Sequence, residues 1–190
     1  MKNLTLILLF TLLVGTNLHS QESYIKNRWT LKLAYANYQI NISNGAWKYE
    51  TTGNYQLEAD YGFLNFLEAG VFGGYSSWLM GNESLYTYGA NFNVHILPFI
   101  IKTENFRFDA YLTGKVGGSI HRYEPYILPG YEAYNLPKIA HRNMLEYGVG
   151  LGGAFYLFKH FGVFAEYSFG KYFFIDNKKF RAGIVIKLNK

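Results

Sequence analysis

Three residues near the middle of the chain have side chains suited to a hydrolytic or acyl-transfer site. Ser119 would supply a hydroxyl nucleophile, His121 a base and Glu124 a carboxylate, and the three could meet at the rim of one loop. Such chemistry requires the nucleophile, the base and the orienting acid to be in contact. Loop histidines and serines are usually solvated polar positions, so we favour that interpretation and assign no catalytic residue.

A second pattern with chemical meaning is G-x-G-x-x-G, formed by Gly148, Gly150 and Gly153. It cradles a pyrophosphate when a strand precedes it and a helix follows. Here the glycines lie within an alternating segment, and no amphipathic helix follows. Small residues that relieve crowding explain them better, so we expect no cofactor.

Metal and thiol chemistry are not expected either. The chain of 190 residues contains no cysteine, which excludes a disulfide scaffold, a cysteine metal cluster and a thiol nucleophile. His95 is predicted to face inward near Glu68 as a structural hydrogen-bonding group. With 19% aromatic and 16% charged residues, the chain is too apolar to be intrinsically disordered.

The elements that must position these side chains are predicted to be strands. From residue 27 onward, apolar residues alternate with polar or small ones in eight segments, which is the period of a strand. The segments cover about residues 28–40, 52–61, 65–77, 86–96, 106–116, 145–155, 163–170 and 180–188. The connections after the second, fourth and sixth segments are short, and the others are generally longer, the longest spanning residues 119–140.

Three features favour a membrane barrel over a soluble sandwich. The polar face is not densely charged, and the apolar face is long enough for the roughly 9 to 11 residues with which a tilted strand crosses hydrocarbon. Aromatic residues gather toward the strand ends, where they favour membrane interfaces. Because every backbone polar group must be paired in lipid, the strands are predicted to close into a barrel. Eight strands leave an interior only wide enough for side chains.

The polar face carries balanced charges that we predict to form an ion-pair network in the lumen. Its basic members are Arg28, Lys32, Arg107, Lys115, Arg181 and Lys187, and its acidic members are Glu58, Asp60, Glu68, Asp109, Glu146 and Glu166. By strand counting, Arg28 and Lys32 lie at the depth of Glu58 and Asp60, Glu166 faces Arg181, and Lys115 faces Glu146. Since an unpaired buried charge is costly, this balance predicts a plugged lumen.

The first 20 residues read as a cleaved secretory signal peptide, followed by a barrel domain over residues 21–190. Lys2 precedes an apolar run over residues 4–14, which is too short to span a membrane as a helix. Cleavage is expected near Ser20, and it would lower the formal charge of +5 by one. No face of the chain concentrates this charge, so nucleic-acid binding is not expected.

The signal peptide, the eight segments, the alternating connection lengths and the closing segment 180–188 together resemble the small eight-stranded outer-membrane β-barrel proteins of Gram-negative bacteria. The chain is similar to the transmembrane domain of outer-membrane protein A. The resemblance implies an all-β, eight-stranded antiparallel up-and-down transmembrane β-barrel in the bacterial outer membrane. It also implies contact with outer-membrane lipids, including lipopolysaccharide, and with the barrel-assembly machinery during insertion. The chain departs from the pattern at its end, because many members end in an aromatic residue and this chain ends in Asn189 and Lys190.

The loop at residues 119–141 holds three of the four prolines and several tyrosines. Stiffened, tyrosine-rich loops suit recognition of sugars, anionic lipid headgroups or another protein, although the same rings could instead extend the barrel wall. Candidate surface contacts are Arg122, Tyr123, Tyr126, Tyr131 and Tyr134.

The leading hypothesis is a non-enzymatic barrel that displays its loops for surface interaction or envelope integrity. The first alternative is an enzyme that modifies lipid A or phospholipid, although the His-x-Ser pattern of the lipid A deacylase family is absent at His95, His121, His141 and His160. The second is a small-solute pore.

Overall fold

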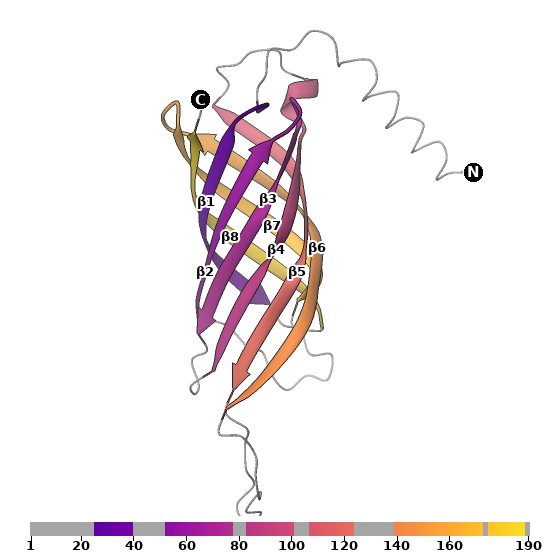
Figure 1. The fold of residues 1–190 in the computed structure, drawn as a ribbon. Helices are drawn as coiled ribbons and strands as arrows, with labels where there is room; N and C mark the ends of the chain where they lie inside the picture. Colours follow the sequence, from indigo (N-terminus) through magenta and orange to yellow (C-terminus); the bar gives the residue numbers. More distant parts are fainter. Residues whose placement is uncertain are drawn as a thin grey trace, which may run out of the picture.

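A computed structural model describes residues 25–39, 52–77, 83–100, 107–123, 139–172 and 175–188. Within these ranges the chain forms eight strands and one short 3₁₀ helix (Figure 1). The elements are β1 (Trp29–Gln39), β2 (Thr52–Gly62), β3 (Leu67–Ser77), β4 (Ser84–His95), η1 (Leu97–Phe99), β5 (Phe108–Tyr123), β6 (Ala140–Tyr156), β7 (Phe161–Tyr172) and β8 (Ile175–Leu188). The predicted signal peptide lies outside the described residues. In the part of the chain that is described, no helix is long and apolar enough to cross a membrane.

The strands close into a single antiparallel up-and-down barrel, as predicted. Each strand pairs with the next along the chain, and β1 pairs with β8 from Trp29↔Leu188 to Gln39↔Lys178. Figure 1 shows the strands tilted around a common axis. Closure leaves no free sheet edge, so the ladder satisfies the backbone around the whole wall.

The two ends of the barrel differ. At the turn end, residues 63–66, 96–107 and 157–160 connect β2 to β3, β4 to β5 and β6 to β7. The last of these connections is closed by the Phe158 amide, which donates to the Phe161 carbonyl at 3.1 Å. The end of β8 and η1 also lie at this end, the upper one in Figure 1. The other four connections lie at the opposite end, called the loop end below.

Two hairpins at the loop end are longer than the sequence predicts. β5 and β6 pair as far as Tyr123↔Ala140, so the assignment of residues 119–123 and 140–141 to a loop is wrong. The apolar alternation breaks at Gly117 and Gly118, but the strand period continues, with Ser119 buried and Arg122 exposed. β7 and β8 likewise pair as far as Tyr172↔Ile175, which corrects the long connection expected between them. Both hairpins run past the apolar band into polar sequence.

Burial in this fold is the reverse of that in a water-soluble protein. Large apolar side chains point outward, with exposed fractions of 63% for Val71 and 64% for Leu145, whereas Glu58 is fully buried and Arg181 is 2% exposed. Because side chains alternate between the two faces of a strand, the sheet has an apolar outside and a polar inside. The lumen is therefore the core of the molecule.

Candidate functional site

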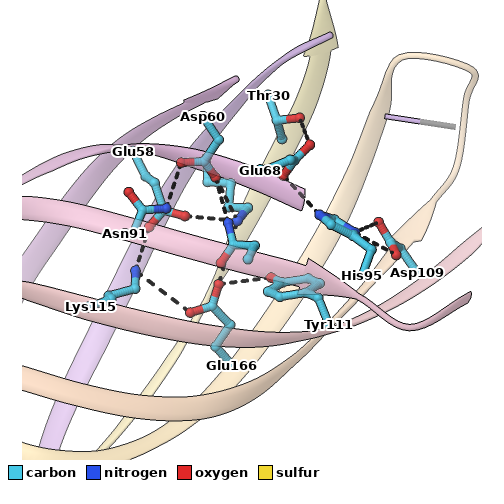
Figure 2. Close-up of polar contacts among 12 residues, drawn as sticks. Thr30, Glu58, Asp60, Glu68, Asn91, His95, Asp109, Tyr111, Lys115 and Glu166 are labelled. Carbon is cyan, nitrogen blue, oxygen red and sulfur yellow. Dashed lines mark hydrogen bonds and ion pairs between the residues drawn. The ribbon is translucent and has the colours of Figure 1, made fainter. Parts of the chain in front are cut away.

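The centre of the lumen is an ion-pair cluster built from five strands (Figure 2). The Glu58 carboxylate on β2 contacts three cations: Lys32 Nζ at 2.8 Å, Lys115 Nζ at 2.5 Å and Arg181 Nη2 at 2.7 Å. Arg181 also contacts Glu166 through Nε at 2.5 Å and Nη2 at 2.6 Å. Glu166 on β7 stands opposite Arg181 on β8 in the strand register. Fork geometry of this kind makes arginine–carboxylate pairs strong.

Neutral donors complete the coordination of the central carboxylates. Asn91 Nδ2 and Asn93 Nδ2 donate to the two oxygens of Asp60 at 2.6 and 3.0 Å, and Lys32 Nζ lies 3.0 Å from the same group. The Tyr111 hydroxyl donates to Glu166 Oε1 at 2.8 Å. Buried charges of this kind are tolerated because they are both paired and hydrogen-bonded.

A second cluster lies toward the turn end. Arg28 Nη2 and the Thr30 hydroxyl donate to Glu68 Oε1 at 2.9 and 2.8 Å. The His95 ring bridges two carboxylates, with Nε2 at 3.1 Å from Glu68 and Nδ1 at 2.9 Å from Asp109. His95 therefore has the structural, hydrogen-bonding surroundings predicted for it.

Two further lysines line the lumen. Lys179, on the loop-end side of Arg181, is buried and interacts electrostatically with the buried Glu146. Lys187 is half-buried, and its Nζ lies 3.2 Å from the centre of the Tyr156 ring. Within the described residues no group of histidine, aspartate and glutamate is arranged to hold a metal ion.

The outside of the wall has an aromatic border at each end of its apolar belt. Toward the loop end, a row of tyrosines runs in direct register across β1 to β4, namely Tyr35, Tyr55, Tyr75 and Tyr86. At the turn end, the rings of Trp29 and Tyr61 lie 5.1 Å apart. Aromatic borders at both ends of an apolar belt are characteristic of transmembrane barrels.

Comparison with known proteins bears on the fold. No family model and no curated protein sequence matches the chain. Among solved structures, Neisserial surface protein A matches with a TM-score of 0.60 and 15% identity over 85% of this chain and 97% of its own. OprG of Pseudomonas aeruginosa matches with a TM-score of 0.60 and 9% identity over 90% of this chain and 100% of its own. Ail, the attachment invasion locus protein of Yersinia pestis, matches with a TM-score of 0.54 and 16% identity over 86% of this chain and 99% of its own. The chain has the fold of a small outer-membrane β-barrel.

In this small outer-membrane barrel fold, the ion pairs differ in part from those expected by strand counting. Lys32 reaches Glu58 and Asp60, and Glu166 reaches Arg181, as expected. Arg28 instead pairs with Glu68. The Lys115 ammonium extends across the lumen to Glu58, three strands away, rather than to Glu146 on the neighbouring strand.

One predicted member is misplaced, and another was missed. Arg107 is exposed at the turn end, before the start of β5, so its assignment to the lumen is wrong. Lys179 takes its place in the balance of charges, because it lies on the inner face two residues before Arg181. Extending the alternation of the last predicted segment by one step would have found it.

The remaining candidates lie at the loop end or in β6. Arg122 is exposed, and the Tyr123 ring stacks on the His121 ring with centroids 5.0 Å apart. His121 Nε2 contacts Glu83 at 3.1 Å, while the buried Ser119 hydroxyl has no hydrogen-bond partner among the described residues. The other candidates at this end, Glu124, Tyr126, Tyr131 and Tyr134, lie outside the described residues. The three glycines of the G-x-G-x-x-G pattern lie inside β6, with a strand on each side.

Proposed function

We propose that the protein is a non-enzymatic integral barrel of the bacterial outer membrane that presents its loop end for surface interaction or envelope integrity. The observation that supports this proposal is the pairing of a lipid-compatible wall with a filled lumen. Val71, Leu145 and Leu151 are at least 60% exposed, and such a surface is stable only in hydrocarbon. The Lys115–Glu58 contact joins β5 to β2 inside.

The proposed contact surface is the end of the β5–β6 hairpin, where Arg122 and Tyr123 pair with His141 and Ala140. A rigid strand pair limits the conformational entropy lost on binding. We propose a protein or glycan ligand at this end. We further propose lipopolysaccharide-containing lipids around the wall and the barrel-assembly machinery as the partner during insertion.

The experiment compares cells that produce the wild type with cells that produce Arg122→Ala/Tyr123→Ala, using sucrose octasulfate as the first probe. That sulfated sugar was present in one structure of Ail. Surface binding and resistance to detergent are measured together. The proposal expects loss of one of them in the variant at unchanged barrel abundance. Unchanged values in this variant and in a variant lacking residues 124–138 would contradict it.

The second candidate is a lipid-modifying enzyme, and the His121–Glu83 contact beside Ser119 is the observation that favours it. Hydrolysis would require the serine hydroxyl to be activated by that histidine. Mass spectrometry of lipid A and phospholipid from cells with Ser119→Ala or His121→Ala discriminates the two. Unchanged acyl composition supports the non-enzymatic proposal, whereas loss of an acyl modification in both variants would replace it.

A further inference from the structure

The three connections at the turn end carry large apolar side chains beyond the ends of the strands. Phe63 is 53% exposed, Ile100 71% and Phe158 72%, and Leu64 and Leu157 are 41% and 46% exposed. Connections that project into water are normally polar. Apolar side chains on all three connections indicate that this end contacts a membrane interface and not only bulk water.

Cations accompany these apolar tips. Lys26, Arg107, Lys159 and His160 are all exposed at the turn end. The acidic side chains that the structure describes near this end, Glu68 and Asp109, are buried and paired inside the lumen. The described surface of the turn end therefore carries positive charge without compensating carboxylates.

The turns are structurally continuous with the aromatic border of the wall. The Trp29 ring lies 5.1 Å from Tyr61, and the Tyr61 ring lies 5.2 Å from Phe63 in an edge-to-face arrangement. On the neighbouring strand, the Lys187 amide donates to the His160 carbonyl at 2.8 Å, and Leu188 pairs directly with Trp29. Trp29 thus lies between the β2–β3 turn and the β6–β7 turn.

We propose that the turn end is a binding surface for anionic phospholipid headgroups, on which Lys26, Arg107, Lys159 and His160 contact phosphodiesters while Phe63, Leu157 and Phe158 enter the acyl-chain boundary. Apolar anchors with basic neighbours bind anionic interfaces through both terms, and the electrostatic part decreases with salt. This inference rests on the proposed membrane location and adds a preference for one lipid class at one end of the barrel.

The experiment uses Trp29 as a reporter in the full chain with Trp47→Phe and Trp78→Phe. The protein is reconstituted in phosphatidylcholine vesicles that contain a fixed fraction of either brominated phosphatidylglycerol or brominated phosphatidylcholine. The proposal predicts quenching of Trp29 by the brominated phosphatidylglycerol at least about twofold stronger than by the brominated phosphatidylcholine. Lys26→Gln/Lys159→Gln should remove the difference, and so should high salt.

The matched control is Arg122→Gln/Lys178→Gln, which removes the same charge from the loop end and should leave the preference intact. Equal quenching by the two lipids in an inserted wild-type barrel would overturn this inference alone. A preference that survives Lys26→Gln/Lys159→Gln would overturn the assignment to these cations. A chain that does not insert into vesicles at all would contradict the proposed function and this inference with it.

Discussion

Lys32 and Tyr111 meet across the barrel: the Lys32 ammonium lies 4.8 Å from the centre of the Tyr111 ring, although β1 and β5 are four strands apart in either direction around the wall. The same tyrosine donates to Glu166 at 2.8 Å. Side chains from opposite walls therefore touch at this depth, which is the geometry of a filled lumen.

The filled lumen predicts that the protein does not conduct. In planar bilayers the wild type should give no steady open channel, because Lys32, Tyr111 and Glu166 occupy the path. The measurement is single-channel recording after insertion has been verified. Long-lived openings of uniform size in the wild type would favour the small-solute pore instead.

The Arg181–Glu166 pair predicts a large and non-additive loss of stability. Arg181→Met leaves Glu166 buried without its bidentate partner and should cost about 3–5 kcal/mol, because an uncompensated buried charge remains. Glu166→Gln in the same chain should recover part of that loss. Unfolding in urea from lipid vesicles measures the three free energies, with Arg122→Gln as an exposed control expected within about 0.5 kcal/mol of wild type. Additive costs for the two substitutions would contradict the pairing.

The apolar belt predicts a penalty for charge on the outside of the wall. Val71 is 63% exposed, and Val71→Lys should destabilise the barrel in a bilayer by about 2–4 kcal/mol if this face is near the midplane. On a sheet exposed to water the same substitution would be nearly neutral. The measurement is again urea unfolding from vesicles, with Phe158→Lys at the turn end as the control. An unchanged free energy for Val71→Lys would argue against a lipid-facing wall.

The strand pattern could be predicted from the sequence because the two-residue period depends only on which face meets lipid. The clean alternation from Tyr86 to His95 places each side chain on the face that the structure shows. The pairing of charges could be predicted only where partners are neighbours in register, as with Arg181 and Glu166.

Contacts across the lumen could not be predicted in that way. The Lys115 side chain is long enough to reach Glu58 on a distant strand, and strand order alone carries no information about such reach. The ends of strands were equally hidden at Gly117 and Gly118, where the apolar face has no side chain to mark the period although the ladder continues.

Two glycines on neighbouring strands predict opposite responses to an added methyl group. A Cβ at Gly152 would lie 2.8 Å from Glu166 Cγ and still closer to the Tyr111 ring, whereas a Cβ at Gly114 would have no neighbour within 4 Å. Gly152→Ala should therefore cost about 1–3 kcal/mol through overpacking of the lumen, and Gly114→Ala should cost little. Equal effects in a thermal or urea unfolding series would contradict the packing described around Glu166.

The central claim, a closed membrane-spanning barrel with a polar core, is tested most directly by gel mobility of the protein from the outer-membrane fraction, with and without boiling. The barrel predicts that the protein is found in that fraction and that the unheated sample migrates differently from the boiled one, because a closed sheet resists detergent until it is heated. A chain recovered as a soluble protein, with identical mobility before and after boiling, would contradict the account.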